Sequence, residues 1–287
     1  MLTRMLFLTG LVLCGMVALT GAWPASLAPL RHDPEATFLA KAVPLDADII
    51  GSGIDARQLL EKALGKLNAE EAVWLNTKIR QTVYEADSRF VVEGFLQRGP
   101  NQCARMEMEV GRSRLVIVSD GDILAHVQKV PGGKVIAAVE RLPALTEETH
   151  VQDRTAREAF LVAKCCGGPA ALLRPIQQHM RNGTLQTGLL QDRPVIQLKA
   201  DLDPAKISAF SAMKLTALSA CLYLDAKTLW PVRIDWTGAE GAKAPRLVRQ
   251  IEFREPVVGV ALDDDACARM FSYHPDGSEN VTEVKRR

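Results

Sequence analysis

The chain has 287 residues, of which 47% are hydrophobic and 24% are charged. Its 35 Lys and Arg residues nearly balance its 34 Asp and Glu residues, so the formal net charge is +1. This balance provides no global field that would collect nucleic acid or an anionic membrane. We therefore expect no nucleic-acid partner. Because all-β domains often reach this length undivided, we also expect one main domain with a single large core.

The N-terminal segment, residues 1–22, has the pattern of a targeting segment. Arg4 precedes an uncharged run from Met5 to Ala22, which is typical of an export signal or a membrane anchor. The run is longer than most signal-peptide cores and barely long enough to span a bilayer. Thr20 and Ala22 supply the small residues of a cleavage site, which favours a cleaved signal peptide over a retained anchor. With either fate the chain is exported.

Residues 23–54 contain Pro24, Pro29, Pro34 and Pro44 and end in a Gly-Ser-Gly sequence, which is typical of a linker. From Asp55, a residue type that often caps helix N-termini, apolar residues recur at helical spacing to residue 67. This stretch predicts an amphipathic helix whose apolar side needs a surface to cover.

Most of the remaining chain alternates between apolar and polar residues, which indicates antiparallel strands. The expected strands are 77–85, 90–97, 105–110, 115–118, 123–127, 135–139, 185–190, 195–201, a hairpin over 221–236, 247–254 and a short strand near 271–273. Asp120-Gly121 marks a hairpin turn. The fold class that follows is mainly β with helices: a broad antiparallel sheet of about 10–11 strands with one covered face.

A helical interlude interrupts these strands. Thr155 and Glu158 form a capping-box pattern for a helix over 155–164, and a second helix runs from Pro169 or Pro175 to Arg181. Together with the helix that begins at Asp55, these segments give three helices, which we expect to lie on the apolar face of the sheet.

The apolar positions of the expected strands define the candidate ligand-binding face. In the hairpin, Trp230, Val232, Ile234 and Trp236 share one side by the two-residue period of a strand. The whole candidate set is Phe90, Val92, Leu96, Met106, Met108, Val110, Trp230, Val232, Ile234 and Trp236. If three helices cover this face incompletely, it forms a slot for acyl chains; if they cover it fully, these residues are closed core.

The cysteines remain unassigned. If the leader is removed, Cys103, Cys165, Cys166, Cys221 and Cys267 remain, and an odd number cannot all pair within one chain. The adjacent Cys165 and Cys166 lack the spacing of a zinc site. A disulfide from one of them to another cysteine and a set of buried thiols both stay open, and no metal or other cofactor is implied.

Two polar groups were considered as sites. Asp263, Asp264 and Asp265 lack the alternating ligands of a calcium loop and are interpreted as a solvated loop. Ser119, Asp120 and His126 flank one hairpin, but no nucleophile-elbow motif supports hydrolysis. We therefore expect no catalytic residues and no enzyme.

Several stretches taken together resemble a known family, the LolA-like periplasmic proteins that sort lipoproteins to the outer membrane of bacteria. They are RFVVEGFLQRG (89–99), ARMEMEV (104–110), RLVIVSDGDILAHV (114–127), CLYLDAKTLWPVRIDW (221–236) and QIEFREPVVGVALDDDACARMFSY (250–273). The resemblance covers residues 55–277 and leaves 278–287 as a basic tail. It implies that the sheet is strongly curved into an unclosed half-barrel and that the three helices plug its concave face. It also implies binding of acyl chains and an arginine inside the barrel, for which Arg80, Arg89 and Arg105 are the candidates.

Three classes of function remain. The favoured one is a periplasmic carrier of lipoproteins or lipids, monomeric and non-catalytic, with an inner-membrane extraction complex and an outer-membrane acceptor as its protein partners. The second is an envelope sensor or adaptor of the same fold that binds a membrane regulator protein. The third and least favoured is a hydrolase.

Overall fold

The computed structural model describes residues 38–41, 54–85, 88–100, 103–110, 113–129, 135–142, 168–207, 210, 213–259, 262–274 and 280–284. Its helices are α2 (Ala56–Val73), α4 (Gly168–His179) and α5 (Asp264–Phe271), with a short 3-10 turn at Pro204–Lys206. Its strands are β1 (Phe38–Ala40), β2 (Leu75–Tyr84), β3 (Arg89–Arg98), β4 (Ala104–Val110), β5 (Ser113–Ser119), β6 (Ile123–Lys129), β7 (Val135–Arg141), β8 (Met180–Leu190), β9 (Arg193–Leu202), β10 (Ala217–Asp225), β11 (Pro231–Ala239), β12 (Arg246–Val258) and β13 (Asn280–Val284).

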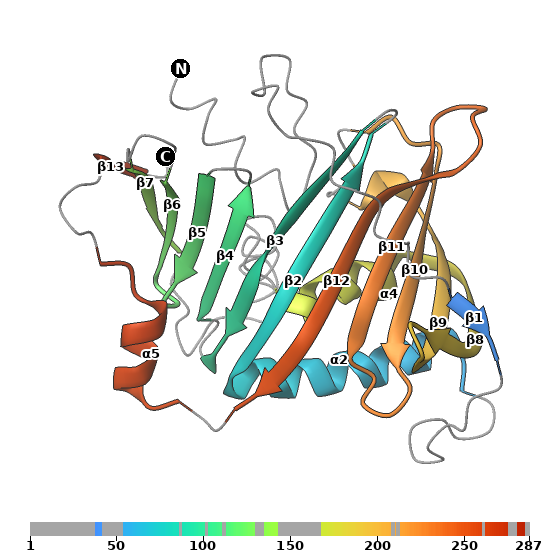
Figure 1. Cartoon of the computed structure of the whole chain (residues 1–287), viewed down its shortest axis with the longest axis horizontal. Coiled ribbons are helices and arrows are strands. Elements are labelled where there is room, and N and C mark those ends of the chain that lie inside the picture. Colours follow the sequence, from blue (N-terminus) through green and yellow to red (C-terminus); the bar gives the residue numbers. More distant parts are fainter. Residues whose placement is uncertain are drawn as a thin grey trace.

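The described strands form one 13-stranded sheet in the order β1-β8-β9-β10-β11-β12-β2-β3-β4-β5-β6-β7-β13. Two antiparallel meanders, β2 to β7 and β8 to β12, are joined where β12 pairs with β2. The order starts at β1 and ends at β13, so the sheet is open, as Figure 1 shows. The expected fold class, a mainly β protein with an unclosed sheet and helices, is confirmed.

Two strands lie in segments where we expected no structure. β1 falls in the proline-rich segment and pairs antiparallel with β8. β13 falls in the expected basic tail and is parallel to β7. These two short edge strands raise the count above the predicted 10–11.

Helix α2 begins where the sequence predicts. The Asp55 carboxylate accepts a hydrogen bond from the Gln58 N–H (2.8 Å), and the Gln58 side-chain oxygen accepts one from the Asp55 N–H (3.1 Å). This reciprocal pair satisfies two donors that a helix start otherwise leaves open. The helix continues to Val73, beyond the predicted residue 67, and its buried stripe is Leu59, Leu60, Ala63, Leu64 and Leu67.

Helix α4 confirms the second predicted helix and ends at His179, because Met180 already belongs to β8. The Arg57 guanidinium of α2 donates hydrogen bonds to the carbonyls of Gln177 (3.2 Å) and Met180 (3.1 Å), so it satisfies acceptors at the α4 C-terminus. Both helices lie behind the sheet in Figure 1. We call the face that they cover the inner face and the opposite one the outer face.

Helix α5 corrects two expectations. The Asp263 carboxylate accepts a hydrogen bond from the Ala266 N–H (2.7 Å), so Asp263 is an N-cap and Asp264 and Asp265 lie in the first helical turn. The three aspartates are exposed to solvent as expected, but they cap and begin a helix, so their interpretation as a loop was wrong. The expected strand near 271–273 was also wrong, since Phe271 is the last residue of α5.

Strands β3 and β4 approach each other closely at Gly94. Gly94 pairs with Met108, and a Cβ at Gly94 would lie 1.8 Å from the Glu107 carbonyl oxygen. No side chain fits at this distance, so the close approach of the two strands depends on glycine. Gly94 thus marks the boundary between β2 and β8–β12 on one side and β4–β7 on the other.

Other predictions fall outside the described residues. These are the leader at 1–22, the helix over 155–164, and Cys165 and Cys166. Within the described ranges, no helix is both long enough and apolar enough to cross a bilayer.

Candidate functional site

The inner face gathers most of the predicted ligand-binding residues. One buried cluster joins apolar side chains of the sheet to the α2 stripe and to Ala170, Leu173 and Ile176 of α4. The predicted residues in this cluster are Val92, Leu96, Met106, Met108, Trp230, Ile234 and Trp236. Phe90 is half-buried on β3, and the side chain of Val110 is not among those described.

Val232 is an exception to the predicted face. β11 shifts register against β10 so that Tyr223 pairs with Arg233 and Leu224 with Pro231, which leaves Val232 without a direct partner. Such a bulge reverses the alternation locally. Val232 therefore packs with Leu190 and Tyr223 in a separate outer-face cluster, and its assignment to the ligand-binding face was wrong.

The β10–β12 part of the inner face is closed by aromatic packing. The Trp236 ring lies 4.9 Å from the Phe210 ring, and the Trp230 ring meets the Phe253 ring edge-on at 6.3 Å. Rings in such pairs are held in a defined geometry and gain stability beyond their buried area. This part of the face has the character of a fixed core.

The β3–β5 part of the inner face is built differently. Met106 lies between Leu96 and Ile117 across the sheet, and Met108 lies between Gly94 and Leu115. Both methionines are 1% exposed. Unbranched thioether chains repack around varied shapes more readily than branched or aromatic side chains. We call the inner-face set Val92, Leu96, Met106, Met108, Leu115 and Ile117 the methionine floor.

Polar side chains border the methionine floor on β6. His126 is paired with Ile117, and Gln128 is paired with Leu115, so both share its face. His126 is 9% exposed, whereas Gln128 is half-buried. The inner face therefore changes from apolar to polar within one strand, which is the arrangement that an amphiphile requires.

The arginines considered for the barrel interior lie on the outer face instead. Arg80 forms an ion pair with Glu93 (3.2 Å), Arg105 forms one with Glu107 (2.7 Å), and strand alternation places Arg89 on the same side. Two other buried arginines lie on the inner face by strand alternation, Arg98 at the end of β3 and Arg249 in β12.

Arg249 is 4% exposed, and its guanidinium carbon lies 5.3 Å from the Phe210 ring centre. It pairs with Trp236 in the regular part of the β11–β12 ladder, on the same side of β12 as Ile251 and Phe253. The two-residue period of these three positions is therefore a usable signal for an inward arginine.

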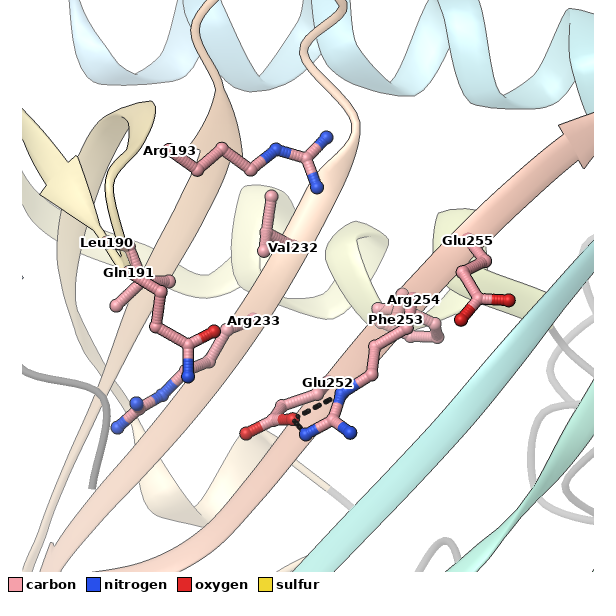
Figure 2. A pocket seen from close by; sticks show the side chains of 9 residues that line it. All are labelled: Leu190, Gln191, Arg193, Val232, Arg233, Glu252, Phe253, Arg254 and Glu255. Atoms are coloured by element: carbon pink, nitrogen blue, oxygen red, sulfur yellow. Dashed lines mark hydrogen bonds and ion pairs between the residues drawn. The ribbon is translucent and has the colours of Figure 1, made fainter. Parts of the chain in front are cut away.

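A separate cavity of about 190 Å³ opens on the outer face, shown in Figure 2. Its arginines are paired with carboxylates: Arg193 with Asp225 (2.8 Å), Arg233 with Asp235 (2.7 Å) and Arg254 with Glu252. Ligand pockets usually measure about 300–1,000 Å³ and are largely apolar. This cavity is too small and too polar for an acyl chain, so we do not assign the ligand to it.

The polar residues around the β5–β6 hairpin have structural partners. The Asp120 carboxylate accepts hydrogen bonds from the N–H groups of Asp122 and Ile123 (both 2.9 Å), and the Ser119 hydroxyl accepts one from the Gly121 N–H (3.2 Å). Asp120 thus shapes the turn in the manner of an Asx-turn. Neither contact prepares Ser119 as a nucleophile.

Comparisons with known proteins give structural matches alone. No protein-family model and no curated protein matches the chain. Among solved structures, LprF from Mycobacterium bovis is 13% identical with a TM-score of 0.41, and the match covers 74% of this chain and 97% of LprF.

Two further matches concern the family that the sequence resembles. A putative outer-membrane lipoprotein-sorting domain from Vibrio parahaemolyticus is 9% identical with a TM-score of 0.30, covering 73% of this chain and 97% of that domain. A LolA superfamily protein from Nitrosomonas europaea is 9% identical with a TM-score of 0.26, covering 75% and 97%. At these levels of similarity, function has to be argued from the chain's own geometry.

Proposed function

We propose that this protein is a non-catalytic envelope protein that holds the acyl chains of lipids or lipoproteins against the methionine floor of its open sheet. The observation that carries this proposal is the division of the inner face. The β10–β12 side is closed by aromatic pairs, whereas the β3–β5 side presents two buried methionines beside polar His126 and Gln128.

The energetics favour a chain-like apolar ligand. Each CH₂ group buried in an apolar slot contributes about 0.8 kcal/mol, so about ten such groups contribute about 8 kcal/mol before the costs of association. Methionines can repack to admit chains of differing length at little cost. A surface that bound no such variable chains would not need side chains as adaptable as methionine.

The setting follows from the N-terminal segment and the family resemblance. We propose that the chain is exported to the bacterial periplasm, free or retained by its leader, and acts there as a monomeric carrier. An inner-membrane extraction complex would supply its cargo, and an outer-membrane acceptor would receive it.

The proposal is tested by titrating the purified full-length protein with a fluorescent long-chain fatty acid. Met108→Ile keeps the side-chain volume but removes flexibility, so we expect binding to weaken several-fold while stability changes by less than about 1.5 kcal/mol. Leu222→Met in β10 is the matched control and should bind like the wild type, because Leu222 is fully buried in the closed part of the face.

Equal binding by the Met108→Ile variant and the wild type would remove the methionine floor from the proposal. No fatty-acid uptake at all would contradict the carrier function itself. If lipid binds and changes the affinity for a membrane regulator rather than passing to an acceptor, the protein is the sensor and not the carrier.

A further inference from the structure

The helix α5 is fastened to the outer side of β4 by contacts near its C-terminus. The Arg105 guanidinium donates a hydrogen bond to the Met270 carbonyl (3.2 Å). Phe271 is fully buried, and its ring occupies the place beside Gly99, where an added Cβ would lie 2.7 Å from it. Any side chain at residue 99 would therefore push α5 away from the sheet.

The same position beside Gly99 is bordered by a cysteine. A tight turn links the Gly99 N–H to the Cys103 carbonyl (3.0 Å) and the Cys103 N–H to the Pro100 carbonyl (3.0 Å). The Cβ of Cys103 lies 3.6 Å from the point where a Gly99 Cβ would be. Cys103 and Phe271 thus both lie beside Gly99.

Cys267 precedes Phe271 by four residues in α5. Side chains at this spacing share a helix face and lie about 5–6 Å apart, so the face that carries Phe271 to Gly99 also carries Cys267 toward Cys103. Burial raises the pKa of the Cys103 thiol to about 11, and the charge of the neighbouring Cys267 adds to this shift. Cys103 is buried and Cys267 half-buried.

We propose that Cys103 and Cys267 form a disulfide that locks α5 onto the turn between β3 and β4 when the protein meets a disulfide oxidant. This modification site is independent of the ligand-binding face. Cys221 is not a competing partner, since it lies on β10 in the outer cluster with Tyr223 and Val232.

The chemistry is a thiol–disulfide exchange. Cys267, the more exposed thiol, loses its proton and attacks one sulfur of the oxidant disulfide, which releases the first oxidant thiolate and leaves a mixed disulfide. That thiolate takes the proton of Cys103, and the Cys103 sulfur then attacks the Cys267 sulfur and releases the second oxidant thiolate. This second thiolate takes up, through water, the proton that Cys267 lost. Two protein thiols are oxidised to one disulfide while one oxidant disulfide is reduced to two thiols.

The link is tested by treating the full-length protein with oxidised glutathione, blocking free thiols, and mapping tryptic peptides without reduction. Cleavage gives peptides 99–105 and 255–269, each with one cysteine. We expect their joined mass in the wild type and in Cys221→Ser, its loss on reduction, and its absence in Cys267→Ser.

A thermal unfolding measurement gives a second readout. Because the disulfide would close a long loop, we expect reduction to lower the melting temperature of the wild type by about 5 °C or more, and to leave that of Cys267→Ser unchanged. The proposal is overturned if both peptides carry blocked thiols after oxidation, or if either is joined to the peptide holding Cys165 and Cys166. The wild-type map decides the matter even if a variant fails to fold.

Discussion

The two halves of the sheet bury apolar side chains by different means. In the β8–β12 half, Trp230 and Trp236 meet aromatic partners in fixed orientations and α2 and α4 lie across the strands (Figure 1). In the β3–β7 half, the inner face is floored by Met106 and Met108 and becomes polar at β6. One half is built to hold the fold and the other, we propose, to accommodate a ligand.

The difference shows that burial alone does not identify a binding face. Trp236 is 4% exposed and Met108 is 1% exposed, so exposure would rank the methionine as the firmer core residue. The chemistry of the side chain separates them, because a thioether chain moves at little cost and a packed indole does not.

Trp236→Ala should give the largest loss of stability. Removing the indole leaves a cavity beside Phe210 and should lower the free energy of unfolding by about 3–5 kcal/mol. Fatty-acid binding by the protein that remains folded should be unchanged. Urea denaturation combined with the fluorescence titration checks both parts. A loss of binding without a loss of stability would mean that the ligand lies in the β8–β12 half, against the proposal.

Asp235→Ala tests how the closed half is held from its outer side. Asp235 accepts hydrogen bonds from Arg233 (2.7 Å) and Gln250 (3.1 Å), and the side chains of the Arg233–Asp235 pair are about nine-tenths buried. The change removes the carboxylate partner of a buried guanidinium, so we expect about 3 kcal/mol of destabilisation by urea denaturation. Lys243→Ala, which breaks an exposed pair, should change stability by less than about 1 kcal/mol and serves as the control.

The same substitution at two glycines tests the boundary between the halves. A methyl group at Gly94 would collide with the β4 backbone, so Gly94→Ala should destabilise by about 2–3 kcal/mol and weaken ligand binding. Gly65 lies in α2 with nothing within 4 Å of an added Cβ, so Gly65→Ala should stabilise by about 1 kcal/mol. Changes of the same sign, seen in parallel unfolding curves, would mean that the strands do not approach as described.

The smallest effect concerns acidification of the β10–β11 turn. Although burial alone would raise it, the pKa of Asp225 is held below its usual value by hydrogen bonds from the Thr228 backbone and Arg193. A lowered folded pKa stabilises the protein above the unfolded pKa of about 3.9, and this contribution is lost as pH falls through the folded value. Between pH of about 5 and 2, the wild type should lose more stability than Asp225→Asn, and parallel losses would contradict this role.

The sequence predicted what depends on local pattern. Alternation located β2 to β12, and the capping residue Asp55 located the start of α2. Prediction from local pattern failed where a one-residue register shift or a contact with a distant segment determines the structure. A register shift sent Val232 outward, and β13 depends on pairing with β7, far away in the chain.

The sequence predicted which residues share the inner face, but not that this face is divided into an aromatic part and a methionine part. The alternation at Met106 and Met108 placed both residues correctly on the inner face. Which apolar positions would meet aromatic partners depended on Phe210 and Phe253, which reach Trp236 and Trp230 only in the folded chain. A short helix such as α5 was missed because three consecutive aspartates obscured the capping role of Asp263.

The most direct test of the central claim is photo-crosslinking with a fatty acid that carries a photoactivatable group near its chain end, followed by peptide mapping. The account predicts labelling of the β4 and β5 peptides that contain Met106, Met108, Leu115 and Ile117, and its suppression by unlabelled fatty acid. Competable labelling confined to the β10–β12 peptides around Trp230 and Trp236, or to the outer-face cavity beside Arg233, would contradict it.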